Sequence, residues 1–245
     1  MTKPTYSDDA VSLYCGDSFR LLDDLGVRAD ITLTDIPYGP RTKRGAWGNR
    51  GKGKTEAIVD FEAFDDQAVL CAIDAMARVT ERWIICFMDW EHVGMVKAYA
   101  PDGWDFVRMG IWVKTNSAPQ LTGDRPAMGW EALAILHRKG RKRWNSGGHR
   151  AVWHHPIARA RQKTKRNKTE KPEGLIAELI QDFADPNGLI VDPFMGTGTT
   201  CVAAKRRGYR SLGVDIREGE VADAANRCRQ ETFFQRLSNQ GTLDV

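Results

Sequence analysis

The residues best suited to chemistry lie near position 35, directly after a short apolar run that ends at Thr34. An amino group attached to an aromatic ring is a poor nucleophile because its lone pair is delocalised into the ring. Two hydrogen-bond acceptors aimed at its N–H groups favour a more pyramidal nitrogen, and the Asp35 carboxylate and Ile36 carbonyl are suited to this. Pro37 stiffens the turn, and Tyr38 offers an aromatic ring that could stack on the ring that carries the amino group. This turn is a candidate site for an amino group.

A second turn has the composition of a cofactor site. The apolar run Leu189–Asp192 ends in an acid, Gly196 and Gly198 follow, and a helical pattern begins at Thr199. Glycines permit positive φ angles and close approach of a ligand, and the N–H groups of a helix start favour polar groups. Asp215 ends the next apolar run, where it could accept hydrogen bonds from ribose hydroxyls. Glycines alone would fit an ordinary turn, but the two acids favour a nucleoside cofactor.

These stretches resemble one known family. The segment Asp192–Thr200 reads Asp-Pro-Phe-Met-Gly-Thr-Gly-Thr-Thr, similar to the cofactor motif of β-class S-adenosylmethionine-dependent DNA amino-methyltransferases. The segment Asp35–Tyr38 resembles that family's Asp-Pro-Pro-Tyr motif. Ile36 replaces the first proline, which leaves the backbone carbonyl but makes the turn less rigid. Thr169–Pro172 is similar to the family's Thr-Glu-Lys-Pro segment, and Gly16-Asp17 to its Gly-Asp pair.

The resemblance implies a fold and a cofactor. The expected fold is α/β, a Rossmann-like class I methyltransferase fold, circularly permuted so that the catalytic half precedes the cofactor half. It would have a mostly parallel seven-stranded sheet with helices on both faces, in a single domain spanning residues 1–245. The expected cofactor is S-adenosylmethionine. The residues expected to bind it are Asp17, Thr169, Lys171, Asp192, Phe194, Gly196, Gly198, Thr199 and Asp215.

Short apolar runs alternate with helical patterns, which independently predicts an α/β protein with a mainly parallel sheet. The predicted strands are Val11–Cys15, Ile31–Thr34, Trp83–Met88, Val107–Val113, Ala132–His137, Leu189–Asp192 and Ser211–Val214. The predicted helices are Asp66–Val79, His92–Tyr99, Pro172–Phe183, Thr199–Arg207 and Glu220–Leu237. Two basic stretches lack periodicity and are predicted to be a loop over 39–59 and a small target-recognition insertion over 139–168.

The positive charge is clustered beyond what the net charge of +4 suggests. The run 41–54 has no acid, and the run 138–171 has only Glu170, so both suit a polyanion. Lys114 and Asn116 either line the DNA side of the pocket or are solvated residues at a strand end. Trp144 and Trp153 either stack on DNA or pack in the core. The predicted DNA-binding residues are Arg41, Lys43, Arg44, Lys114, Asn116, Arg141, Lys142 and Arg143.

The expected reaction is methylation of a flipped adenine at N6 in double-stranded DNA. In the resembling family, aspartate at position 35 usually accompanies adenine and serine more often accompanies cytosine N4. Cytosine N4 methylation, an RNA or single-stranded substrate, and an inactive binding module remain as alternatives. A homodimer and a partner restriction enzyme are both compatible with the sequence.

The remaining composition describes an ordinary globular protein. The five cysteines lack metal-type spacing, so no metal site is expected and the thiols are predicted to stay reduced. No signal peptide or bilayer-length apolar run is found, so a cytoplasmic location is expected.

Overall fold

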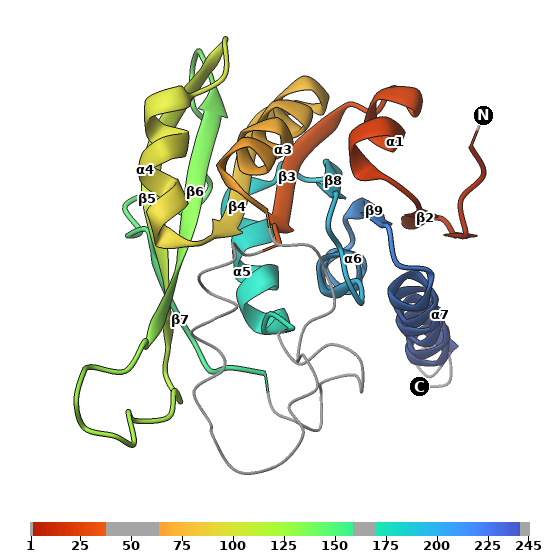
Figure 1. Cartoon of the computed structure of the whole chain (residues 1–245). Coiled ribbons are helices and arrows are strands. Elements are labelled where there is room, and N and C mark those ends of the chain that lie inside the picture. Colours follow the sequence, from red (N-terminus) through yellow and green to blue (C-terminus); the bar gives the residue numbers. More distant parts are fainter. Residues whose placement is uncertain (1, 38–63, 159–169, 241–245) are drawn as a thin grey trace.

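The computed structural model describes residues 2–37, 64–158 and 170–240, with only the backbone described over 232–240 (Figure 1). The strands are β1 Tyr6–Ser7, β2 Val11–Cys15, β3 Ala29–Asp35, β4 Thr80–Met88, β5 Trp104–Lys114, β6 Trp130–Arg138, β7 Val152–His155, β8 Leu189–Asp192 and β9 Arg210–Asp215. The helices are α1 Ser18–Asp24, α3 Asp66–Val79, α4 Trp90–Tyr99, α5 Glu173–Phe183, α6 Thr199–Arg206 and α7 Glu218–Gln240.

All strands belong to one nine-stranded sheet in the order β1-β2-β9-β8-β3-β4-β6-β5-β7. The run from β2 to β4 is parallel, β6 is antiparallel to β4 and β5, β7 is parallel to β5, and β1 is an antiparallel edge. The seven predicted strands are present, but the prediction of seven in total was wrong. β1 and β7 are only two and four residues long, too short for a periodic signal.

The predicted insertion over 139–168 contains one strand, β7, within its described part, where its composition predicted irregular structure. The β7 residue Trp153 is 1% exposed, its ring lies 6.2 Å from that of Phe183, and its indole donates to Asp182 (2.8 Å). Trp144 is also partly buried, with its ring 4.8 Å from the Phe183 ring. Both tryptophans therefore pack in the core, which was one of the two predicted alternatives.

The sheet is covered on both faces, and the strand periodicity decides which side chains point to which face. On β4, Ile85 and Phe87 join the core cluster that contains α5 and α6, whereas Ile84 and Cys86 join the cluster that contains α3 and α4. α7 packs beside α6 over β2 and β9. α1 was not predicted. It is short, and its start is set by Asp17, which caps it by accepting a hydrogen bond from the Phe19 amide (2.9 Å).

The order of the strands brings the two halves of the chain together. β3 lies beside β8, with Ile31 opposite Ile190, although more than 150 residues separate them in the sequence. Both strands run in the same direction, so their carboxyl ends meet at one edge of the sheet, below the arrowheads of β3 and β4 in Figure 1. Ligands of open α/β sheets bind at such edges, and both predicted turns emerge there.

Candidate active site

The turn after β3 is anchored by packing rather than by a second proline. Asp35 is the last residue of β3 and lies opposite Phe87 of β4. The Ile36 amide donates to the Phe87 carbonyl (3.3 Å), and the Ile36 side chain is 2% exposed within the core cluster of α3 and α4. A buried β-branched side chain fixes the turn where the resembling family has proline. Pro37 follows, and Tyr38 lies outside the described residues.

A buried hydrogen bond joins β3, which carries the predicted catalytic residue Asp35, to the predicted cofactor turn after β8. The Thr34 hydroxyl donates to Asp192 Oδ1 (2.6 Å), which also accepts the Phe194 amide (3.2 Å). Asp192 is 4% exposed, and this burial raises the pKa of its carboxyl group to about 6. The predicted cofactor residue Asp192 thus shapes the turn through its protein contacts.

The glycine turn has the backbone that its sequence predicted. Gly196 has φ 51° and Gly198 has φ 78°, conformations that favour glycine. A Cβ atom on Gly198 would lie 2.7 Å from the Cβ of Ala224 in α7. Gly198 is also the N-cap residue of α6, and as a glycine it has no side chain to cap this helix start. The turn therefore presents backbone N–H groups at the carboxyl edge of the sheet.

The acid at the end of β9 is engaged by the protein. Asp215 is 6% exposed, its Oδ2 accepts the Gly196 amide (2.9 Å), and its Oδ1 accepts the Arg217 amide (2.9 Å) and Nε (3.1 Å). Asp215 thus braces the glycine turn from the neighbouring strand. Its predicted contact with ribose hydroxyls remains a prediction.

Three aromatic rings meet between the cofactor turn and the starts of two helices. Phe194 in the turn lies 6.2 Å from Phe19 of α1 and 5.5 Å from Phe64, which precedes α3. All three side chains are partly buried. Asp17, predicted to lie near the cofactor adenine, is two residues from Phe19, so the structure brings the Asp17 segment and the Phe194 turn together.

A buried polar cluster lies at the start of α6. Thr199 Oγ1 donates to Glu170 Oε1 (2.7 Å), and Arg227 from α7 pairs with the same oxygen (2.6 Å). Glu170 Oε2 is buried and has no hydrogen-bond partner among the described residues. Sequence reasoning missed both Glu170 and Arg227. The Thr-Glu-Lys-Pro segment signalled Glu170, whereas nothing in the α7 pattern singled out Arg227. Thr169, from the same segment, lies outside the described residues.

The ammonium group of Lys171, a predicted cofactor residue, pairs with the carboxylate of Asp35. It also lies 3.2 Å from Glu131 Oε2 on β6, and Glu131 Oε1 lies 2.7 Å from Lys114 Nζ on β5. Burial lowers the pKa of Lys171, but the charges of Asp35 and Glu131 outweigh burial and raise it above its usual value. Four charged residues from three strands and the segment before α5 thus form one chain, Lys114–Glu131–Lys171–Asp35.

The predicted DNA-binding residues fall into three groups by location: the Asp35 edge of the sheet, its opposite end, and the part of the chain outside the described residues. Lys114 is at the Asp35 edge and is paired with Glu131. Asn116 is at the same edge, where its side chain accepts from the Ile157 amide (2.6 Å) and donates to the Ile157 carbonyl (3.4 Å). Asn116 therefore ties down the chain after β7. Arg41, Lys43 and Arg44 lie outside the described residues.

Arg141, Lys142 and Arg143 lie at the opposite end of the sheet from Asp35. Lys142 pairs with Asp105 near the start of β5 (2.8 Å). The Arg143 carbonyl accepts from the Trp83 indole near the start of β4 (2.7 Å). The structure thus does not bring this basic triplet to the site that it was predicted to serve.

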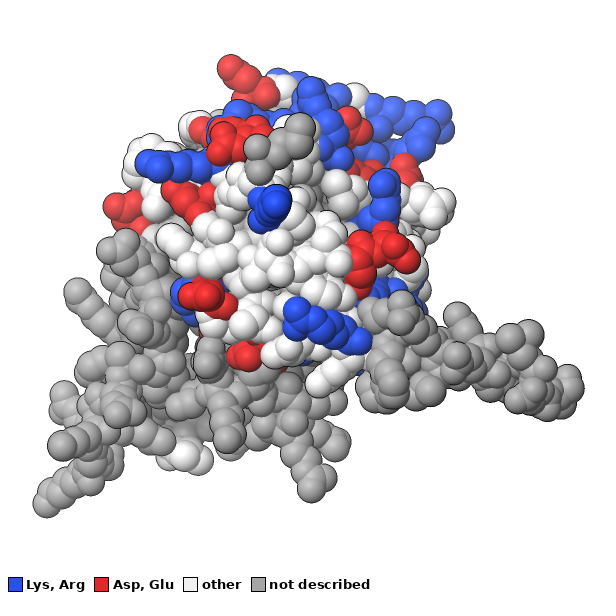
Figure 2. Space-filling view, turned by 90° about the vertical axis from the view of Figure 1, so that its right-hand side faces the viewer, with Lys and Arg blue, Asp and Glu red and all other residues white. Residues whose placement is uncertain are grey.

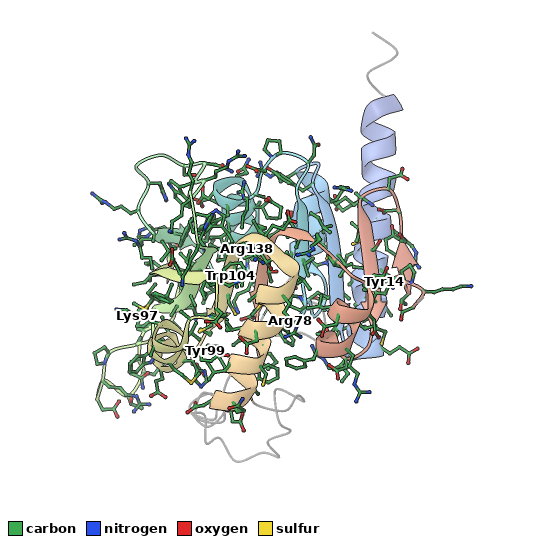
Figure 3. The ribbon with its side chains drawn as sticks, turned by 90° about the horizontal axis from the view of Figure 1, so that it is seen from above. Tyr14, Arg78, Lys97, Tyr99, Trp104 and Arg138 are labelled. Atoms are coloured by element: carbon green, nitrogen blue, oxygen red, sulfur yellow. The ribbon has the colours of Figure 1, made fainter. Side chains whose placement is uncertain are left out.

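Other basic residues are also committed away from the site. In Figure 3, Arg138 at the end of β6 lies beside Trp104 at the start of β5, and its guanidinium carbon is 5.3 Å from the ring centroid. Arg138 also donates to the backbone carbonyls of Ala77 and Thr80 (3.2 and 2.8 Å). On the face shown in Figure 2, Lys and Arg gather at the upper margin, which is the end away from the arrowheads of β3 and β4 in Figure 1. Positive charge alone therefore does not locate the DNA face.

Two negative findings concern the described ranges only. Within residues 2–37, 64–158 and 170–240, no three His, Cys, Asp or Glu side chains group as a metal site would require. No helix in those ranges combines the length and the apolar character needed to cross a membrane.

Comparison with known proteins agrees with this geometry. Residues 29–226 match the DNA methylase family of N6/N4 methyltransferases. The chain is 28% identical to the type II methyltransferase M2.LlaDCHI of Lactococcus lactis subsp. cremoris, over 96% of this chain and 95% of that protein.

Two solved structures share the fold. The complex of M1.HpyAVI with S-adenosylmethionine has a TM-score of 0.67 and 21% identity, and the alignment covers 89% of this chain and 99% of that one. The PvuII DNA methyltransferase, described as cytosine-N4-specific, has a TM-score of 0.68 and 13% identity over 92% and 89%. The chain therefore belongs to the N6/N4 family of S-adenosylmethionine-dependent DNA amino-methyltransferases.

Proposed function

We propose that this protein transfers a methyl group from S-adenosylmethionine to the N6 amino group of a flipped adenine in double-stranded DNA. The observation that carries the proposal is the placement of Asp35 at the end of β3, one residue after the threonine that bonds to the cofactor turn. An acceptor for an amino group and a turn for a nucleoside cofactor thus share one edge. Aspartate rather than serine at position 35 favours adenine over cytosine, as in the resembling family.

The residues around the turn fit the cofactor. Glu170 Oε2, which is buried beside the start of α6 and has no hydrogen-bond partner within the described ranges, would accept a hydrogen bond from the α-ammonium group of the methionine part. The backbone of Gly196 to Thr199 allows close approach, and the N–H groups of α6 would face the carboxylate. The partly buried rings of Phe19, Phe64 and Phe194 would flank the adenine ring of the cofactor. When bound there, the cofactor supplies an electrophilic methyl group on a sulfonium centre.

The chain's own residues hold the nucleophile. The Asp35 carboxylate and the Ile36 carbonyl would each accept one N–H of the target amino group. Both acceptors belong to a turn fixed by the Ile36 side chain and its bond to Phe87, so little reorganisation is needed when the base arrives. Positioning of the two reactants would account for much of the rate acceleration. The proposed role of Tyr38, which is to stack on the flipped base, is inferred from the sequence alone.

Identification of the methylated nucleoside tests the proposal. The protein is incubated with methyl-labelled cofactor and, in separate reactions, with duplex DNA, single-stranded DNA or RNA, and the products are digested to nucleosides. We expect N6-methyladenine from duplex DNA. Label found only in N4-methylcytosine would reassign the base, and label found only in RNA would reassign the substrate.

A further inference from the structure

We propose that Lys171 is a positioning residue for the reaction, which holds the Asp35 carboxylate in its acceptor orientation and ionised state. The inference deepens the proposed function and rests on Asp35 as the acceptor of the amino group. It does not depend on which base is methylated, because adenine and cytosine present the same N–H groups. It also departs from the sequence prediction, in which Lys171 binds the cofactor.

The first support is geometric. The ammonium group of Lys171 contacts Asp35 Oδ2 and lies 3.2 Å from Glu131 Oε2. Lys171 immediately precedes Pro172, the N-cap residue of α5, so its backbone is fixed by a helix start rather than by a flexible loop. A carboxylate held through one oxygen by a fixed cation has little freedom to rotate. The direction of Oδ1 is therefore set before any substrate arrives.

The second support is the burial of the pair. The Lys171 side chain is 6% exposed, and its ammonium group lies 5.1 Å from the centroid of the Phe87 ring. A cation so poorly hydrated attracts a neighbouring carboxylate strongly. Two further acids favour a positive charge at this position. Asp192 on β8 lies near Asp35, and Glu131 on β6 pairs with Lys171. The Cys86 thiol on β4 is buried, which raises its pKa and keeps it neutral.

The third support is that Lys171 is itself held. Glu131 contacts Lys171 through one oxygen and Lys114 through the other, which lies 2.7 Å from Lys114 Nζ. Two carboxylates and two ammonium groups thus alternate across β3, the segment before α5, β6 and β5. This alternation leaves the network close to neutral and limits the cost of burying it.

Two variants separate a positioning role from a cofactor contact. Lys171→Met removes the charge, and Lys171→Arg keeps it. We expect Lys171→Met to reduce the single-turnover rate of methyl transfer by about a hundredfold while the Kd for S-adenosylmethionine stays unchanged. Lys171→Arg should restore part of the rate. A loss confined to cofactor affinity would overturn the proposal.

A titration of the carboxyl group tests the same idea without activity. Asp35 is observed by carbon NMR of protein labelled at the aspartate carboxyl groups, and its signal is assigned from Asp35→Asn. In Lys171→Met the midpoint of the Asp35 signal should move to higher pH, since the neighbouring positive charge is gone. The acid limb of the rate profile should move in the same direction. Equal midpoints in the two proteins would overturn the proposal.

Lys205 provides a matched control. Its side chain is 4% exposed and pairs with Asp8 and the Cys228 carbonyl, away from the Asp35 edge. Lys205→Met should lower the melting temperature but leave both the single-turnover rate and the Asp35 midpoint unchanged. If it reproduced the Lys171→Met effects, those effects would be general destabilisation. If wild-type protein methylated no nucleic acid, the proposed function would fail, whereas the NMR midpoints would still decide the role of Lys171.

Discussion

The hydroxyl of Thr34 donates a 2.6 Å hydrogen bond to Asp192 Oδ1, and this buried contact links strand β3, which ends in the proposed catalytic residue, to strand β8, which leads into the proposed cofactor turn. Thr34 immediately precedes Asp35, and Asp192 begins the glycine turn. The bond therefore couples the position of the amino-group acceptor to the position of the cofactor turn, although the two residues come from opposite halves of the chain.

Thr34→Val should weaken both the fold and the cofactor site. Valine keeps the shape but leaves Asp192 with one fewer donor, at a cost of about 1–3 kcal/mol in unfolding free energy. We expect cofactor affinity to fall about tenfold, which corresponds to 1.4 kcal/mol. Thr32→Val is the control, because Thr32 lies on the same strand and its buried hydroxyl pairs with Thr80 (2.6 Å). Calorimetry showing equal cofactor affinity in both variants would contradict the coupling.

Replacement of Asp35 should slow transfer strongly while the cofactor still binds. Asp35→Ala removes one of the two acceptors for the amino group, and loss of one such group costs about 10²–10³ in rate. The rate is measured in single turnover at saturating cofactor, and cofactor binding is measured separately. Transfer at the wild-type rate would show that Asp35 is not the acceptor.

Gly198→Ala should be much more costly than a glycine replacement elsewhere in the same region. Gly198 and Gly208 have φ of 78° and 77°, so both alanine variants bear the strain of the left-handed conformation, about 1–2 kcal/mol. At Gly198 the new methyl group would meet Ala224, at 2.7 Å, whereas at Gly208 no atom of the described part of the chain lies within 4 Å. Denaturant unfolding should therefore show an additional loss of about 1–3 kcal/mol for Gly198→Ala. Equal losses would argue against the close α6–α7 contact.

The buried carboxyl group of Asp192 should make stability depend on pH. Its pKa is about 6 in the folded protein against 3.8 for the unperturbed group, because burial disfavours the charge. Between about pH 4 and pH 6 the folded state thus keeps a proton that the unfolded chain has lost. The contribution of this proton to the unfolding free energy is fully present below about pH 4 and disappears as pH rises through 6. The difference amounts to about 3 kcal/mol.

Asp192→Asn isolates this contribution, since the amide keeps an oxygen to accept from Thr34 and Phe194. The unfolding free energy of the variant relative to wild type should rise by about 3 kcal/mol between pH 4 and pH 7. A difference that stays constant over that range would mean that Asp192 titrates normally.

The two basic runs should contribute unequally to DNA binding. Changing Arg41, Lys43 and Arg44 to glutamine should flatten the salt dependence of DNA affinity by about 0.9 per lost phosphate contact. The same change at Arg141, Lys142 and Arg143 should leave the slope nearly unchanged, because this triplet lies near the starts of β4 and β5. A flatter slope for the second variant would place DNA at both ends of the sheet.

The sequence by itself determined the five longer helices, seven of the strands and the two turns. The continuous apolar runs of buried strands such as β4 and the helical periods of α3 and α5 are local signals, so both kinds of element could be predicted. Glycines at positions 196 and 198 predicted a tight turn, because they adopt positive φ angles that other residues avoid. Parallel strands place their carboxyl ends at one edge, so the meeting of Asp35 with the glycine turn could also be predicted.

Only the tertiary structure decided which side chains meet. The pairing of Lys171 with Asp35, the bond from Thr34 to Asp192 and the return of Arg143 to the start of β4 depend on strand order and register. Strand β7 was hidden because four residues carry too little periodicity, and it is held in place by the buried Trp153. Contacts between distant segments carry no local sequence signal, since a charged residue in a basic run reads the same whether it faces DNA or a buried carboxylate.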